Sequence, residues 1–311
     1  MGSLFVFPGQ GSQSVGMGRE LYDNYQSARE IFDAVDDALG QKLSDIIFNG
    51  PIEDLTLTAN VQPAIFAVSM AMLAAFTAKD EGRGMTKDGK MPSSFIPHPS
   101  SIPYVAGHSL GEYTALCAAG ALSIADTARL LRLRGESMQA AVPVGMGMVS
   151  VIMGLDIEKV REICESAGAE VANDNSPGQV VISGLKEPVE RAMEIAKDAG
   201  AKRAMPLPLS APVHCKLQAP TAAVMRDALN KIDMKSPVVP LISNKTCAPM
   251  TDVNEIKEAL VYQITHGVRW RETILALPAL GIMETIEIGP GNVLTGLTPR
   301  IVPDMAAKKL D

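Results

Sequence analysis

The chain has 311 residues, of which 47% are hydrophobic and 20% charged, so it has enough apolar side chains for one large core or two domains. This composition excludes a disordered chain, which would have fewer apolar and more charged residues. The net charge of −7 argues against general nucleic-acid binding, which needs a basic face.

The first part of the chain alternates between short apolar runs and amphipathic stretches. The run at 4–7 stops at Pro8 and Gly9, which is typical of a buried strand that leads into a tight loop. The predicted elements, in chain order, are a strand over 4–7, helices over 19–39 and 63–79, a strand over 103–106, and helices over 110–119 and 123–141, the last with Ser123 as N-cap. This alternation predicts an α/β fold with a largely parallel sheet.

The pattern changes from about residue 149. Strands are predicted over 149–153, 170–173, 179–183 and 203–207, with helices over 157–167 and 187–199. Their order is βαββαβ, the ferredoxin-like arrangement. We therefore expect a small subdomain over 143–207, inserted into a large α/β domain that consists of 1–142 and 208–311. A cleft between the two would be the natural ligand site.

Cysteine usage and hydropathy indicate the compartment. The 4 cysteines are scattered, without a CxxC pair or a Cys/His cluster at zinc spacing, which predicts reduced thiols and no metal site. The opening residues lack a basic segment followed by an apolar stretch, so we expect no secretory signal. The longest apolar stretch, 64–76, predicts a buried helix, because a membrane span needs about 20 apolar residues. Together these features predict a cytoplasmic protein.

Residues 107–111 read Gly-His-Ser-Leu-Gly and match GxSxG, the pattern of a nucleophile elbow. In such an elbow the serine lies on a sharp turn from strand to helix, and the flanking glycines prevent collisions. The helix N-terminus would favour the negative charge that develops when Ser109 attacks a carbonyl group. A glycine-rich turn that happens to contain serine would show the same residues. The predicted strand before and helix after it favour a nucleophile in a hydrolase-like core.

A serine nucleophile needs a base, and the sequence has 4 histidines. His108 is predicted to be structural, because neighbouring side chains at an elbow point apart. His98 lies in a proline-rich segment, and His266 follows a predicted helix. His214 is the candidate base, because we expect it after a strand of the main sheet, where α/β folds display functional side chains. A hydrogen-bonded loop histidine is the alternative, and no acidic residue is an obvious third member.

The loop at 7–13, Phe-Pro-Gly-Gln-Gly-Ser-Gln, lacks the lysine of a P-loop and the third glycine of a dinucleotide fingerprint. Two interpretations remain open for it. Its backbone N–H groups supply half of an oxyanion hole, or it is simply a tight turn from strand to helix.

Arg129, Arg132 and Arg134 lie on the predicted helix that follows the elbow. Most arginines in such a helix are solvated. One that turned inward would bind a carboxylate through two parallel hydrogen bonds. Spacing alone does not choose among the three.

Five motifs, taken together and in this order, resemble those of the malonyl-CoA:acyl carrier protein transacylases of bacterial type II fatty acid synthesis. The similarity extends from about Leu4 to Ile301. The motifs are the 7–13 loop, Gly107-His-Ser-Leu-Gly-Glu-Tyr113, Arg132-Leu-Arg-Gly135, Asn175-Ser-Pro-Gly-Gln-Val-Val181 and Ser210-Ala-Pro-Val-His214.

The resemblance implies a two-step exchange. Ser109 would take malonyl from coenzyme A as an ester and then surrender it to the phosphopantetheine thiol of acyl carrier protein. His214 matches the family's catalytic base, which deprotonates the serine and protonates the departing thiolate. Gln263 matches the residue whose backbone carbonyl orients that histidine, which accounts for the missing acid.

The same resemblance implies the remaining site residues. The backbone N–H groups of Gln10 and Leu110 would form the oxyanion hole. Arg134 matches the arginine that holds the free malonyl carboxylate, so the site would reject acetyl-CoA. We expect malonyl-CoA and acyl carrier protein as partners, with no permanently bound cofactor, no metal, no nucleic acid and no membrane, and a monomeric state.

Two departures from the family pattern stand out. The segment at 79–103 is longer than in compact members and predicts a surface loop. Pro299 stands where the family often has lysine, which would weaken a basic contact.

Three alternative functions share some of these features. A serine hydrolase has the same GxSxG pattern, but Arg134 and the absent acid count against it. An acyltransferase for another donor, such as methylmalonyl-CoA, is not excluded by Val213 beside His214. A scaffold that binds acyl carrier protein without turnover would need no nucleophile.

Overall fold

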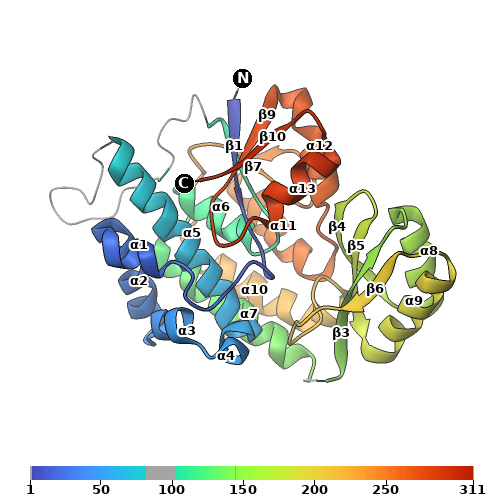
Figure 1. Cartoon of the computed structure of the whole chain (residues 1–311). Helices are drawn as coiled ribbons and strands as arrows, with labels where there is room; N and C mark the ends of the chain where they lie inside the picture. The colour runs from blue at the N-terminus through green and yellow to red at the C-terminus, as the bar shows by residue number, and fades with distance from the viewer. Residues whose placement is uncertain (1, 82–94, 96–101, 144, 311) are drawn as a thin grey trace.

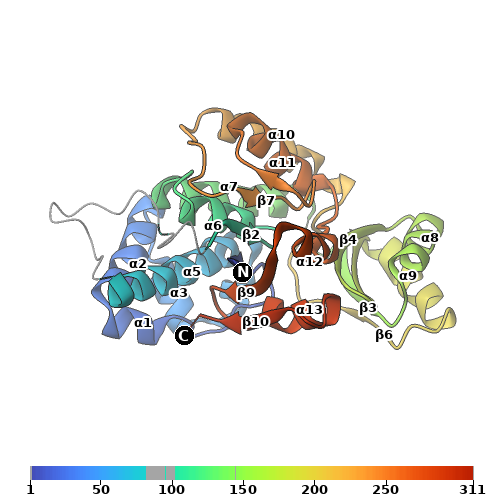
Figure 2. The ribbon, with the colours of Figure 1, turned by 90° about the horizontal axis from the view of Figure 1, so that it is seen from above.

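The computed structural model of the chain describes residues 2–81, 95, 102–143 and 145–310. A large α/β part holds both ends of the chain, and a smaller part with its own sheet projects to one side (Figure 1). The same separation is visible from above (Figure 2). Most of the predicted loop at 79–103 falls outside the described residues.

The large part is built on a 6-stranded sheet with the order β10-β9-β1-β2-β7-β8. The first five strands in this order run parallel to one another, and β8 is antiparallel to β7. This arrangement confirms the predicted α/β fold. The strands are Gly2–Phe7 (β1), Tyr104–Gly107 (β2), Leu241–Ile242 (β7), Pro249–Met250 (β8), Ile282–Glu287 (β9) and Ala306–Lys309 (β10).

Helices pack against both faces of this sheet. They are Arg19–Asn24 (α1), Gln26–Leu39 (α2), Leu43–Asn49 (α3), Ile52–Thr56 (α4), Thr58–Glu81 (α5), Gly111–Ala118 (α6), Ile124–Ala141 (α7), Ala219–Asn230 (α10), Val253–Thr265 (α11), Trp270–Ala276 (α12) and Val293–Ile301 (α13). Two 3-10 turns, Lys216–Gln218 and Pro278–Leu280, complete the set.

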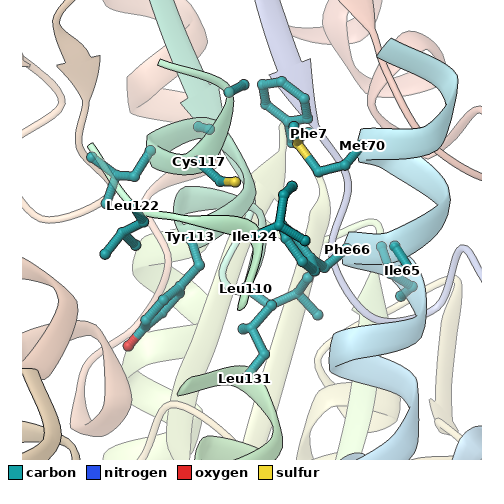
Figure 3. Close-up of a cluster of buried hydrophobic side chains, with 14 of the residues drawn as sticks. Phe7, Ile65, Phe66, Met70, Leu110, Tyr113, Cys117, Leu122, Ile124 and Leu131 are labelled. Carbon is teal, nitrogen blue, oxygen red and sulfur yellow. The ribbon is translucent and has the colours of Figure 1, made fainter. Parts of the chain in front are cut away.

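The first strand shows how the two faces are filled. Side chains alternate along a strand, so Leu4 and Val6 join the apolar cluster under α12 and α13. Phe5 and Phe7 join the larger cluster on the opposite face, which includes side chains of α2, α5, α6 and α7. Figure 3 shows Phe7 and Leu110 in this cluster. The turn after β1 and the turn after β2 are thereby held between two packed layers.

The predicted helix over 19–39 is interrupted at Tyr25, which is extended (φ −125°, ψ 118°). The Arg29 side chain explains the break, because its guanidinium donates to the carbonyl groups of Tyr22 and Asp23 at the end of α1. Carbonyl groups at a helix end need such donors. Periodicity alone did not reveal the break, because α1 and α2 continue one apolar pattern.

Helix α5 begins at Thr58, earlier than predicted, and contains Pro63. By length and composition it is the one candidate membrane span among the described residues, with a mean hydropathy of 1.7 over Thr58–Ala78. In the structure, 83% of the most apolar 18-residue stretch of this helix is buried within the protein. It packs against α2 and α7, as a core helix does, which agrees with the buried helix predicted over 64–76.

The smaller part contains a 4-stranded antiparallel sheet with the order β4-β5-β3-β6. Its elements are Gly147–Met153 (β3), Ile157–Ala167 (α8), Glu170–Ser176 (β4), Gln179–Leu185 (β5), Lys186–Asp198 (α9) and Arg203–Pro206 (β6). This is the predicted βαββαβ order. The apolar faces of α8 and α9 form a separate core with the sheet. These six elements extend from Gly147 to Pro206.

Candidate active site

The turn between β2 and α6 has the geometry of a nucleophile elbow. Ser109 has a φ of 55°, which is rare for a residue other than glycine. A Cβ atom at Gly107 would overlap the backbone of Gly111, and one at Gly111 would overlap the carbonyl of Phe7. The two glycines therefore permit the sharp turn, as the GxSxG pattern predicts. The Ser109 side chain is presented at the start of α6.

Asn244, which follows β7, stabilises this strained turn. Its Oδ1 atom accepts a hydrogen bond from the backbone N–H of Ser109 at 3.0 Å, and its Nδ2 atom donates to the carbonyl of Gly107 at 2.8 Å. The side chain is 1% exposed. We did not predict this residue. The available signal was the polar pair Ser243-Asn244 directly after the apolar run 238–242, at a strand end where α/β folds place functional groups.

His214 contacts Ser109, with its Nε2 atom 2.7 Å from Oγ. Its Nδ1 atom lies 2.5 Å from the backbone carbonyl oxygen of Gln263. A carbonyl only accepts hydrogen bonds, so Nδ1 carries the proton and Nε2 accepts from the serine hydroxyl. Burial, and next the charge of Arg134, lower the pKa of His214 to about 3. The imidazole is therefore neutral, and the lone pair of its Nε2 atom can take the proton of Ser109.

The expected position of His214 after a strand of the main sheet is wrong. The preceding strand is β6 of the smaller sheet, and the segment from 207 to 215 crosses back to the large part without regular structure. Ala211 and Val213 are buried along this crossing, and His214 itself has a positive φ of 54°. Packing of the crossing segment, and not a strand end, positions the histidine.

Arg134 on α7 is the arginine that turns inward. It is 1% exposed, and its Nη2 atom donates to Ser109 Oγ at 3.1 Å and to Gln263 Oε1 at 2.9 Å. Its Nη1 atom donates to Gln62 Oε1 at 2.6 Å. These acceptors are uncharged, so the guanidinium charge is available to an anionic ligand. Its Nε atom is buried without a partner, and burial lowers the pKa of Arg134.

The other two arginines of α7 point elsewhere. The Nε atom of Arg129 donates to the carbonyl of Ala38 at 3.2 Å. Arg132 donates to Asn60 Oδ1 at 2.6 Å and to Gln41 Oε1 at 3.0 Å. The structure thus places only Arg134, of these three, at the elbow.

Gln62 was not predicted as a site residue. It lies in α5, is 1% exposed, and accepts from Nη1 of Arg134, whereas Gln263 accepts from Nη2. Asn60 and Gln62 are the two amides at the start of this otherwise apolar helix, and they were the available signal, because a buried polar side chain needs a hydrogen-bond partner.

The loop at 7–13 packs directly against the elbow. A Cβ atom at Gly9 would lie 2.7 Å from the carbonyl oxygen of His108, and Ser12 Oγ bonds to the carbonyl of Gly9 at 2.9 Å. The hydrogen bonds of the described residues leave the backbone N–H groups of Gln10 and Leu110 without an acceptor. Both groups are therefore available to an oxyanion, as an oxyanion hole requires.

A buried carboxylate, Glu112, lies in the first turn of α6. It is 0% exposed and accepts a hydrogen bond from the backbone N–H of Asn244 at 2.6 Å and one from Gln263 Nε2. Burial raises the pKa of Glu112 to about 7. Its bonds run to Asn244 and Gln263 and not to His214, so it does not replace the missing acid of a catalytic triad.

The remaining histidines have other surroundings. The Nε2 atom of His108 lies 2.9 Å from Asn175 Oδ1 of β4, and its ring packs near Trp270. His108 thus connects the elbow to the smaller sheet, which fits the structural role predicted for it. His266 stacks on Tyr262, with ring centroids 3.7 Å apart. His98 lies outside the described residues.

His214 lines a surface pocket of about 380 Å³. The pocket walls come from α8 and β4 of the smaller part and from residues 214–216 and 265–267 of the large part. The pocket lies between the two parts, and its lining includes His214 but neither Ser109 nor Arg134. Within the described ranges, no cluster of three or more His, Cys, Asp or Glu side chains has the geometry of a metal site.

Comparison with known families places the chain among acyltransferases. The acyl transferase domain model matches residues 4–302. The malonyl CoA-acyl carrier protein transacylase of Bacillus subtilis is 44% identical over 302 residues, which is 96% of this chain and 89% of that protein.

Solved structures show the same similarity. An acyl-carrier-protein S-malonyltransferase from Bartonella henselae superimposes with a TM-score of 0.91 and 49% identity, over 100% of this chain and 95% of that one. A malonyl-transacylase solved in complex with its type II PKS acyl-carrier protein superimposes with a TM-score of 0.90 and 40% identity, over 100% of this chain and 96% of that one.

Proposed function

The chain belongs to the family of malonyl-CoA:acyl carrier protein transacylases, and we propose that it forms malonyl-acyl carrier protein through a malonyl ester on Ser109. One observation carries this assignment of the nucleophile. Ser109 Oγ lies 2.7 Å from a neutral histidine nitrogen and 3.1 Å from a buried guanidinium. A base and a carboxylate-binding cation thus meet at one hydroxyl group.

In the first step, His214 Nε2 takes the proton of Ser109 while Oγ attacks the thioester carbonyl of malonyl-CoA. The N–H groups of Gln10 and Leu110 stabilise the oxyanion of the tetrahedral intermediate. The intermediate then collapses, the C–S bond breaks, and the thiolate of coenzyme A takes the proton from Nε2. Because its surroundings disfavour the imidazolium, His214 passes the proton on instead of keeping it.

In the second step, the phosphopantetheine thiol of acyl carrier protein replaces coenzyme A. Nε2 takes the thiol proton, the sulfur attacks the ester carbonyl, and Ser109 Oγ leaves with that proton. The same base and oxyanion donors serve both directions, so the reaction is a ping-pong exchange with no net change in the enzyme. The backbone carbonyl of Gln263 keeps His214 in the required tautomer throughout.

Arg134 binds the free carboxylate of the malonyl group. A guanidinium binds a carboxylate through two parallel hydrogen bonds. The side chains that accept hydrogen bonds from Arg134 in this structure are neutral, so its charge is not yet paired. Acetyl-CoA leaves this buried cation without its anionic partner. Sites built around such a polar contact reject the analogue that lacks it by up to about 10⁴-fold.

We further propose a cytoplasmic monomer that works without a permanently bound cofactor, because the coenzyme A thioester arrives as the substrate. The free cysteines support a reducing compartment, since Cys117, Cys164 and Cys215 are buried as unpaired thiols. Neither nucleic acid nor a membrane is part of this proposal.

Intact mass spectrometry tests the proposed function. The protein incubated with malonyl-CoA should gain one malonyl group, lose it to added holo acyl carrier protein, and fail to gain it when Ser109 is replaced by alanine. An adduct that survives Ser109→Ala would place the nucleophile elsewhere. Release of free malonate at the same rate with and without carrier protein would instead identify a hydrolase. When malonyl-CoA and methylmalonyl-CoA are offered together, the acyl group found on the protein identifies the preferred donor.

A further inference from the structure

Glu112 belongs to the elbow motif but has no part in the chemistry described above. It is completely buried, although an ionised carboxylate is costly to bury without strong partners. It accepts hydrogen bonds from the backbone N–H of Asn244 at 2.6 Å and from the Nε2 atom of Gln263, and the nearby hydroxyl of Ser243 also favours its ionised form. This environment suits an ionised carboxylate, which only accepts hydrogen bonds.

The contact with Glu112 determines which way the Gln263 amide points. The Nε2 atom faces two acceptors, the Glu112 carboxylate and the carbonyl of Ser109 at 3.3 Å. The Oε1 atom is thereby turned toward Arg134 Nη2, from which it accepts at 2.9 Å. The reversed amide would place its NH₂ group against the guanidinium and its oxygen against the carboxylate, so both contacts would be repulsive.

We propose that Glu112 is a positioning residue that fixes the orientation of the Gln263 amide and, through it, holds Arg134 in place for the malonyl carboxylate. This inference rests on the proposed function, because it assigns Glu112 to the selectivity for malonyl over acetyl donors. Glu112 contacts no substrate and takes no proton in the reaction. Its effect reaches the acyl group through Arg134, which it holds by way of the Gln263 amide.

The ionisation of Glu112 gives this arrangement a pH dependence. Burial raises its pKa to about 7, and the opposing influences are the hydrogen bonds it accepts and the charge of Arg134. The other titratable groups that face it are Tyr113 on α6 and Cys247 after β7, both neutral at pH 7 because burial raises their pKa values. When Glu112 is protonated, it can donate a hydrogen bond to the Gln263 side chain as well as accept one. Both orientations of the Gln263 amide are then possible. A glutamine in place of Glu112 would have the same effect.

The test compares Glu112→Gln with a matched control. Glu287→Gln alters an equally buried carboxylate, which accepts its hydrogen bonds from Leu294 and Thr295 at the start of α13. Rates of malonyl and acetyl adduct formation on Ser109 are measured by intact mass spectrometry. We expect Glu112→Gln to lower the malonyl-to-acetyl ratio about tenfold, the size of one charge-assisted hydrogen bond, and Glu287→Gln to leave it unchanged. Equal slowing of both donors in Glu112→Gln would overturn the assignment.

A double-mutant cycle tests the route through Gln263. Gln263→Leu removes the amide but keeps the backbone carbonyl that contacts His214. If Glu112 acts through this amide, Glu112→Gln lowers the malonyl-to-acetyl ratio no further in the Gln263→Leu background. Independent, multiplying effects would overturn the proposal.

Wild-type protein supplies a second measurement in case Glu112→Gln does not fold. Its malonyl-to-acetyl ratio should fall as the pH drops from 8 to 6, through the pKa of about 7. A constant ratio over that range would overturn the inference. Failure of the proposed function is distinguishable, because wild-type protein would then form no malonyl adduct on Ser109 at any pH.

Discussion

The guanidinium of Arg134 donates a hydrogen bond to the hydroxyl of Ser109, with Nη2 3.1 Å from Oγ. The same oxygen donates its proton toward His214. A positive charge beside Oγ favours the negative charge that develops there during attack, whichever acyl donor is bound. We therefore expect Arg134 to serve two purposes: to assist the nucleophile through this contact and to bind the malonyl carboxylate, as proposed above.

Replacement of Arg134 by alanine should slow malonyl adduct formation far more than acetyl adduct formation. Loss of a buried charged contact to a carboxylate costs about 3 to 5 kcal/mol, while the loss of the Ser109 contact costs both donors about 1 to 2 kcal/mol. Single-turnover mass spectrometry with each donor measures the two rates. Arg132→Ala, on the same helix but directed away from Ser109, is the control and should change neither. If Arg134→Ala slowed malonyl and acetyl adduct formation by the same factor, Arg134 would not be the carboxylate-binding residue.

Replacement of Asn244 by alanine should slow both donors equally. It removes the acceptor for the Ser109 N–H and the donor to Gly107, which hold a backbone turn of positive φ. An unsatisfied buried N–H costs about 1 to 3 kcal/mol, so we expect roughly a 10- to 100-fold loss in the rate of acylation. Adduct kinetics with malonyl-CoA and acetyl-CoA measure it. A change in the malonyl-to-acetyl ratio would contradict a role confined to the elbow.

The transfer of acetyl, which does not use the carboxylate site, should lose between pH 8 and pH 5 no more than the Arg134–Ser109 contact contributes, about 1 to 2 kcal/mol. A histidine with its usual pKa of about 6.5 would be mostly protonated at pH 5 and unable to act as a base. Burial and Arg134 lower the pKa of His214 to about 3, so it stays neutral over this range. Acetylation of Ser109 followed across the range measures the profile. A loss that continues to grow about tenfold per pH unit below pH 6.5 would show that the imidazole is not shielded in this way.

Replacement of Ser123 by alanine should lower stability without altering selectivity. Its hydroxyl oxygen caps α7 by accepting a hydrogen bond from the Asp126 N–H at 3.0 Å. Loss of such a cap costs about 1 kcal/mol of the free energy of unfolding, which urea denaturation measures. Because Arg134 lies far along the same helix, the malonyl-to-acetyl ratio should stay constant. A shifted ratio would mean that the end of α7 influences the site.

Short sequence patterns were enough to predict several parts of the structure. The GxSxG spacing predicted the elbow at Ser109, and the alternation of apolar runs predicted both sheets. The resemblance pointed to Arg134, which spacing left equivalent to Arg129 and Arg132. In the structure only this one of the three contacts Ser109. Its role, like those of Gln10 and Leu110, stays a prediction until the variants are measured.

The sequence by itself determined the elements around the elbow and in the smaller part, because helix and strand periods and glycine spacing are local properties, and its motifs pointed through the family resemblance to the residues able to do the chemistry. Only the tertiary structure decided that Gln62 and Gln263, from two helices distant in sequence, both accept hydrogen bonds from Arg134. It also placed Glu112 and Asn244 beneath the nucleophile. These contacts depend on how side chains pack in a buried volume, which no short pattern records.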